Sequence, residues 1–244
     1  ADVTLVAGGD LVVASRFQGD YDALARPSAP LTADVGIGPS LAVNALEHTV
    51  LAEVRDATLS GNTVSGPDRT DLTVTAVGAF DSDAVAEAGA TGAVSLPAAV
   101  AAHYGDFRTV ARTAASTTPT VLSGNVTVSA DHTETADTVA DTSVAGGAAS
   151  VGGAIAAGYT AGGARAESGL RVLLPGGTFS VTATHTSDLR SDATAGQAGA
   201  TPGPLDALVS ETLESQVESL LGVVGAGELP DNVLDALDRA APQT

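Results

Sequence analysis

The chain has 244 residues, and its 29 acidic side chains outnumber 10 basic ones, all of them arginine, to give a formal net charge of −19. A surface of this sign repels phosphate backbones and anionic lipid, so nucleic acid and membrane-surface partners are disfavoured. Cysteine is absent, which excludes disulfide frameworks, thiolate zinc sites and cysteine nucleophiles.

Two further features of the composition bear on where the protein works. An acid-rich, lysine-free surface is typical of proteins in high salt, and a genome that favours arginine codons is the alternative explanation. No stretch of about 18 apolar residues is free of polar interruption, so we expect no transmembrane helix. The start at Ala1 lacks a basic segment followed by an apolar one, and we interpret the chain as a processed mature form or an excised segment.

An internal repeat organises the first 200 residues. Four segments share an apolar alternation, a glycine-containing turn and a second alternation, as in TVLSGNVTVSA from Thr120 and RVLLPGGTFSVTA from Arg171. Glycine and asparagine accept the backbone angles of tight turns, and the flanking period of two is the pattern of a half-buried strand. The turn pairs are Gly8-Gly9, Gly61-Asn62, Gly124-Asn125 and Gly176-Gly177.

A second marker runs in step with these turns. Ser40, Ser95 and Ser150 each open a stretch rich in small apolar residues, and they are 55 residues apart, while the residues after the turns recur every 53 or 54. The copy from Ser95 is rich in alanine and resembles a helix, but the copy from Ser150 contains too much glycine for one. We therefore predict strands at all three, with backbones or sheets in close approach.

These patterns predict an all-β fold for residues 1–200: a β-solenoid, or a wide sandwich-like solenoid, of about 54-residue repeats that stack into one core. The number of rungs in each repeat stays open. After the break TPGP, residues 201–244 change to helical spacing of apolar residues, and we predict a short helical C-terminal cap, with an oligomerisation or docking helix as the alternative. The apolar positions are Leu205, Leu208, Val209, Leu213, Val217, Leu220 and Leu221.

The turns of the TLSGN and DLTVTA type, the strands rich in Thr, Asp and Ala, and segments such as SLAVNALEHTVLAEV carry a family resemblance. Residues 1–200 resemble the repeats of giant secreted bacterial adhesins of the filamentous-haemagglutinin type. The resemblance implies a β-solenoid stalk or fibre with adhesive or surface-layer duty, and it carries over no catalytic residue.

Candidate ligand residues recur with the repeat. His48 and His103 are 55 residues apart and His132 and His185 are 53 apart, so stacked repeats would form two imidazole pairs, each a conceivable metal-binding or pH-sensing site. Aspartates recur in the polar strands, and stacked carboxylates suit Ca²⁺ as the one cofactor we weigh. The metal candidates are therefore Asp81, Asp83, His48 and His103, against the simpler interpretation of duplicated structural positions and a solvated acidic face.

Catalytic motifs give no support for an enzyme. The sequence has no GxSxG, P-loop or HExxH motif, and tryptophan, which often seats sugars, is absent. Asn125 begins the single N-x-T sequon, a glycosylation candidate at a predicted turn. We predict a secreted, non-catalytic structural or adhesive segment at the cell surface, with cell-surface or matrix components or copies of itself as partners. A filament subunit joined by strand exchange is the alternative, and a β-helix enzyme acting on polysaccharide is the remote one.

Overall fold

The structure is a computed structural model, and it describes residues 3–26, 32–55, 57–60, 69–116, 119–145 and 149–198. Within these ranges every regular element is a β-strand, so the prediction of an all-β fold is confirmed. Nowhere in the same ranges is there a helix with the length and apolar character needed to cross a membrane. The predicted helical segment 201–244 and the turn at Gly61-Asn62 lie outside the described residues.

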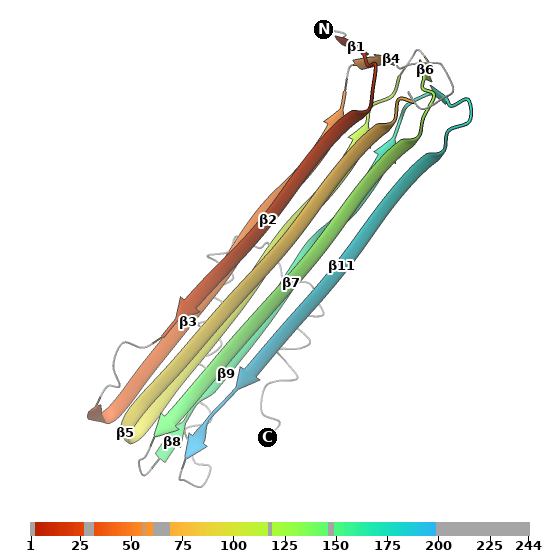
Figure 1. Cartoon of the computed structure of the whole chain (residues 1–244). Coiled ribbons are helices and arrows are strands. Elements are labelled where there is room, and N and C mark those ends of the chain that lie inside the picture. Colours follow the sequence, from red (N-terminus) through yellow and green to blue (C-terminus); the bar gives the residue numbers. More distant parts are fainter. Residues whose placement is uncertain are drawn as a thin grey trace.

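Long strands account for most of the chain. They are accompanied by short strands, which lie at the two ends of the molecule (Figure 1). The long strands are β2 (Leu11–Ala25), β3 (Thr32–Val54), β5 (Leu72–Thr113), β7 (Val126–Ala145), β9 (Gly153–Ser168) and β11 (Phe179–Thr194). The short strands are β1 (Val3–Val6), β4 (Ala57–Ser60), β6 (Thr120–Val121), β8 (Ala149–Val151), β10 (Val172–Leu173) and β12 (Gln197–Ala198).

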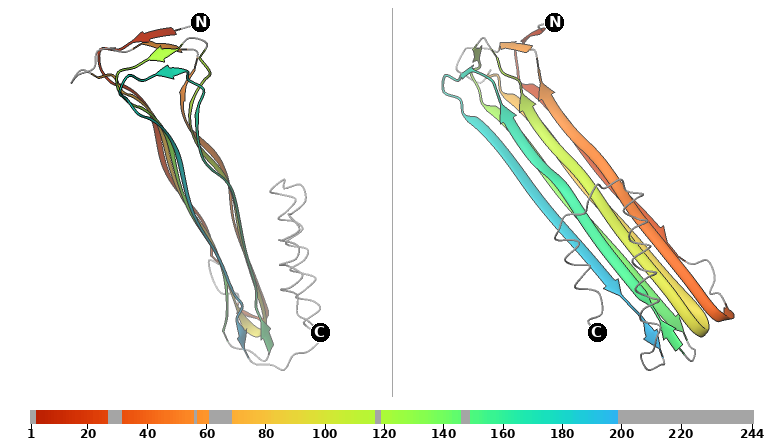
Figure 2. Two further views of the ribbon diagram at one scale, coloured as in Figure 1. Left: turned by 90° about the vertical axis from the view of Figure 1, so that its right-hand side faces the viewer. Right: turned by 180° about the vertical axis from the view of Figure 1, so that it is seen from behind.

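The long strands form two layers that face each other (Figure 2). One layer contains β2, the first half of β5, β7 and β11, and the other contains β3, the second half of β5, and β9. All of these pairings are parallel, as are those of β1, β4, β6 and β10, which form a third, small sheet. Among the described pairings only β8 with β12 is antiparallel. Each pass of the chain therefore adds one strand to each layer, an arrangement compatible with a β-solenoid.

Side-chain alternation explains why these residues form strands with one buried face. Along β5 from Leu72 to Ala90 the even-numbered residues are buried between the layers, and the odd-numbered ones, rich in Thr and Asp, face outward. The segment after Ser95 that resembles a helix is strand throughout, as are its counterparts in β3 and β9. The prediction of strands at these three stretches is confirmed.

The interior holds two apolar clusters of different composition. Toward the end with the small sheet of β1, β4, β6 and β10, larger side chains such as Phe80, Phe107 and Leu122 pack together with valines. Toward the other end the cluster is almost entirely alanine, including Ala86, Ala101 and Ala140. Since alanine fills little space, the two layers must approach closely there, as the small residues of the sequence predicted.

The pairing register agrees with the predicted interval in part. Thr75 lies opposite Ser129, 54 residues later, and Asn125 contacts Thr178, 53 residues later. The first interval is longer: Asp10 contacts Asp71, 61 residues later, and Glu53 pairs with Arg112, 59 residues later. Ser95 is in register with Ser150 but lies opposite Gly36, so Ser40 is not its structural counterpart.

Candidate metal centre

Polar side chains cross the interior between the two apolar clusters. Five buried polar residues of β5 and β7 lie within or beside this region: Ser82, His103, Thr109, His132 and Glu134. Strand alternation directs all five toward the space between the two layers. We call these five residues the inner polar layer. They differ from an ordinary apolar core because an ionisable group inside a protein costs free energy unless it is paired.

One end of the inner polar layer is a chain of hydrogen bonds. Asn44 Nδ2 lies 2.8 Å from the Asp83 backbone oxygen and 3.1 Å from Ser82 Oγ, and Ser82 Oγ lies 3.0 Å from His103 Nδ1. Burial lowers the pKa of His103 below its ordinary value of 6.5, against an opposing effect of the Glu134 charge. His103 Nε2 is buried and has no hydrogen-bond partner among the described residues.

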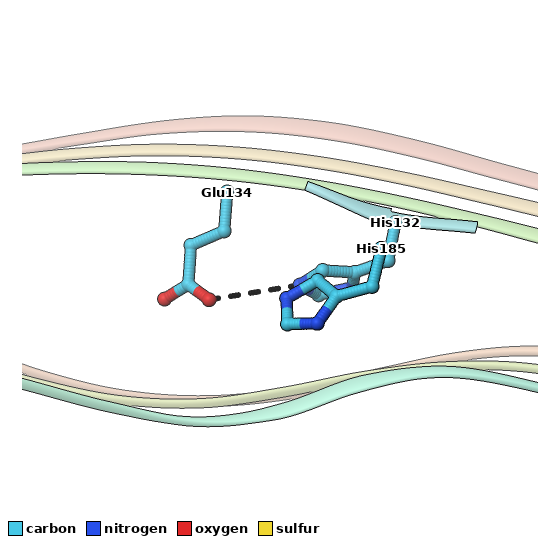
Figure 3. A group of neighbouring side chains, drawn as sticks. All are labelled: His132, Glu134 and His185. Atoms are coloured by element: carbon cyan, nitrogen blue, oxygen red, sulfur yellow. Dashed lines mark ion pairs between the residues drawn. The ribbon is translucent and has the colours of Figure 1, made fainter. Parts of the chain in front are cut away.

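His132 and Glu134 project from β7 into the same space (Figure 3). His132 Nδ1 is 3.0 Å from Thr109 Oγ1, so this nitrogen has a partner on the opposite layer. His132 Nε2 and Glu134 Oε1 are both buried without a hydrogen-bond partner in the described part of the chain. Nε2 and Glu134 Oε2 are 3.7 Å apart, too far for a hydrogen bond but close for two ligands of one ion.

His185 completes the group from the neighbouring strand β11. It lies in register with His132, with ring centroids 5.0 Å apart and planes at 72°. Ligand atoms of His132, Glu134 and His185 all lie within 4.8 Å of one another, the only such group of His, Asp and Glu that the described residues contain. Unlike the other two side chains, His185 is exposed.

Glycines shape the walls around this group. A Cβ at Gly78, the partner of His132 on β5, would overlap Thr109 Oγ1, so only glycine there leaves room for the hydroxyl that contacts His132. Across the interior, Gly162 and Gly163 have φ of 124° and 136°, and a Cβ at Gly163 would sit 3.3 Å from His185 Nδ1. Other residues rarely adopt such angles, so β9 keeps its backbone close to His185 only with glycine.

The two predicted histidine pairs have different outcomes. His132 and His185 lie in register on neighbouring strands, as predicted, with their rings edge to face. His48 and His103 do not, and that prediction is wrong, because the first interval is 59 residues and not 55: His48 lies opposite Phe107, and His103 opposite Asn44. The His48 ring packs instead on Phe17, with centroids 3.9 Å apart.

Glu134 was not predicted as a ligand. A signal for it exists in the sequence, since His132 and Glu134 are two residues apart on one strand and therefore share a face.

The predicted acidic candidates Asp81 and Asp83 lie on the outward face of the layer that contains β7. Asp20 and Asp22 pair with Asp81 and Asp83, and Asp83 pairs in turn with Asp137. Burial, followed by the charges of Asp81, Asp137, Asp22 and Asp20, raises the pKa of Asp83 above its ordinary value of 3.8.

The register does not extend this acidic row to the other aspartates of β7 and β11. Asp141 lies opposite Thr194, Asp188 opposite Thr135 and Asp192 opposite Val139. No three carboxylates among the described residues bring oxygens within 4.8 Å of one another, so calcium binding at Asp81 and Asp83 stays a prediction.

Asn125 has a structural role at its turn. Its Oδ1 accepts hydrogen bonds from the backbone nitrogen of Thr178 at 3.0 Å and from Thr178 Oγ1 at 2.8 Å. The same contact recurs one pass earlier, where Asp71 Oδ1 accepts from the Asn125 nitrogen at 2.6 Å, and before that, where Asp10 Oδ1 accepts from the Asp71 nitrogen at 3.1 Å. These contacts form a turn ladder that links consecutive passes, and glycosylation of Asn125 stays a prediction.

Comparisons with known proteins add nothing to these observations. A scan against family models finds no match, and no curated protein or solved structure shows significant similarity to the chain.

Proposed function

We propose that the chain is a non-catalytic, extracellular structural or adhesive segment, built as a β-solenoid of about 54-residue coils. The observation that carries the proposal is the in-register parallel pairing of successive passes in both layers. Such an arrangement contacts only its neighbours along one axis and can be lengthened by adding coils, which suits a stalk, a fibre or a surface adhesin.

Exposed side chains on the outer faces fit a role in contact with other surfaces. On the outer face of the β3, β5 and β9 layer, Tyr104 and Tyr159 stack with ring centroids 5.6 Å apart and remain 38% and 43% exposed. Tyrosine is enriched where proteins meet partners, because its ring is apolar and its hydroxyl is polar. Ile37 and Leu41 add exposed apolar area on the same face.

The secreted location can be tested directly. Antibodies against the chain should label intact producing cells or their surrounding matrix, and negative-stain electron microscopy of the purified chain should show rods. Labelling that needs permeabilised cells would refute the extracellular assignment. Binding to matrix or glycan components, reduced by a Tyr104→Ala and Tyr159→Ala double change but not by Thr133→Ala on the other layer, would support adhesion.

A filament subunit is the second candidate, and one observation favours it. The side chains of β11 that face the interior are exposed, Phe179 at 47%, Val181 at 41% and Leu189 at 42%, whereas their partners on β7 are buried. A further coil from a second copy would cover them.

Assembly can be tested on this face. Filaments should form with the intact chain and disappear with Val181→Asp but not with Thr182→Asp, whose side chain faces outward. Deleting residues 1–15 should also stop assembly by strand exchange, and undiminished filaments after that deletion would contradict it. The remote enzyme alternative requires turnover in a broad polysaccharide screen that a single Asp→Asn change abolishes.

A further inference from the structure

We propose that His132, Glu134 and His185 form a binding site for a divalent transition metal of the Zn²⁺ class, which clamps strand β11 to strand β7. The proposal rests on the convergence of three ligand atoms and on two buried atoms, His132 Nε2 and Glu134 Oε1, that lack hydrogen-bond partners in the described part of the chain. It does not depend on whether the protein is a stalk, an adhesin or a filament subunit.

The distances suit a small cation. In a tetrahedral zinc site with bonds of about 2.0–2.1 Å, two ligand atoms are roughly 3.3 Å apart. The 3.7 Å between His132 Nε2 and Glu134 Oε2 is close to this value. The ligand atoms of all three residues lie within 4.8 Å of one another, and rotation about side-chain torsions can bring them to the shorter distances of a zinc site. Two ligands come from β7 and one from β11, so a bound ion joins consecutive passes of the chain.

The surroundings prepare His132 to act as a ligand. Its Nδ1 contacts the buried Thr109 hydroxyl at 3.0 Å, and a hydrogen bond on one ring nitrogen is what fixes the other nitrogen of a metal-binding histidine in place. That leaves Nε2, the nitrogen nearest Glu134, directed into the group. Thr109 is thus a positioning residue, and Gly78 is the reason its hydroxyl fits.

Charge and accessibility agree with this assignment. Glu134 is 3% exposed and its Oε1 has no hydrogen-bond partner among the described residues, and a buried carboxylate is costly unless a cation compensates it. Two imidazole nitrogens and one carboxylate favour zinc and its neighbours over Ca²⁺ and Mg²⁺, which prefer oxygen ligands throughout. His185 is exposed at the edge strand, so an ion can reach the group from solvent, and a water can take the fourth position.

Metal titration tests the proposal. The full chain, first stripped with a chelator, should bind one equivalent of Zn²⁺ in competition with a chromophoric indicator. Co²⁺ in its place should give the strong visible absorption of a four-coordinate site. Zn²⁺ should raise the melting temperature of the intact chain, because an ion that binds only the folded state stabilises it. Excess Ca²⁺ should not displace the bound Zn²⁺.

Variants separate this site from diffuse binding to an acidic surface. His185→Ala and Glu134→Gln should each weaken Zn²⁺ binding by more than 100-fold and abolish the melting shift, and Thr109→Val should weaken it by roughly 10–100-fold. Asp137→Asn, on the outward face of the same strand, should leave the affinity unchanged. The proposal is overturned if the intact chain binds no zinc, if His185→Ala binds as tightly as the intact chain, or if Asp137→Asn removes binding. Since His185 is exposed, its variant is expected to fold even if Glu134→Gln does not.

Discussion

Asp83 on β5 and Asp137 on β7 occupy the same register position on neighbouring parallel strands, and Asp22 on β2 extends the row on the other side of Asp83. Neighbouring strands are about 4.8 Å apart, so Asp83 has a like charge on each side. On β11 the next position is Arg190, which ends the acidic row with a compensating charge. Neutralising Asp83 therefore relieves electrostatic repulsion from both neighbouring strands.

Asp83→Asn should stabilise the protein at neutral pH by a few tenths of a kcal/mol to about 1 kcal/mol, the range for relieving a cross-strand repulsion. Because the pKa of Asp83 is raised in the folded state, the folded chain holds its proton more tightly than the unfolded chain. Its contribution to stability falls as pH rises from 3.8 through the folded pKa, so the gain from Asp83→Asn should vanish below pH 3.8.

Urea unfolding at pH 7 and at about pH 3.5 would measure this difference. Asp131→Asn is the matched control, because the register partners of Asp131 on the two neighbouring strands are Val77 and Thr184, neither of which carries a charge. An equal gain in both variants would indicate net charge as the cause, and the row of aspartates would lose its special role.

The turn ladder gives a second prediction. Asp71 Oδ1 accepts the backbone N–H of Asn125 at 2.6 Å, a bond that joins consecutive passes of the chain. Asp71→Ala removes this acceptor and should lower the free energy of unfolding by about 1–2 kcal/mol. Asp71→Asn keeps an oxygen in place and should cost much less. Denaturant melts of the two variants would check this, and equal losses would mean that the contact contributes little.

The all-β fold class, the positions of the strands and the close approach of the layers could be predicted from the sequence. Each of them depends on a local pattern of residues. The alternation in Leu72–Ala90 and the small residues after Ser95 are visible without any knowledge of the fold. The pairing of His132 with His185 followed from a single interval of 53 residues, which the structure keeps.

The failure at His48 and His103 has a physical origin. Register is set by the pairing of whole strands, and the longer first interval shifts β3 by four residues relative to the expected match, so His48 faces Phe107. Sequence spacing cannot reveal where an insertion is absorbed. The contact of Thr109 with His132 could not be predicted either, because it joins the two layers and depends on the distance between them.

Salt should stabilise the protein. A net charge of −19 on a chain of this length produces self-repulsion in the compact state, and at about 1 M salt the Debye length is near 3 Å, so most of that repulsion is screened. We expect the melting temperature to rise between low and molar sodium chloride. A flat or falling melting temperature would remove the argument for adaptation to high salt.

Gly78 and Thr109 give the last prediction, because they come from opposite layers and compete for one space. A Cβ at Gly78 would overlap Thr109 Oγ1 and lie 2.8 Å from Phe80 Cε2, so Gly78→Ala should lower the free energy of unfolding by about 1–3 kcal/mol. Thr109→Ala alone should also destabilise, because it leaves His132 Nδ1 without its partner. In the double variant the overlap with the hydroxyl is gone, so the two losses should sum to more than the measured loss. Gly89→Ala on the same strand is the control, since its Cβ would approach nothing closer than Ser143 Oγ at 3.2 Å. Strictly additive losses in the cycle would show that Gly78 and Thr109 do not share a space, and the packing of the two layers around His132 would have to differ from the one described.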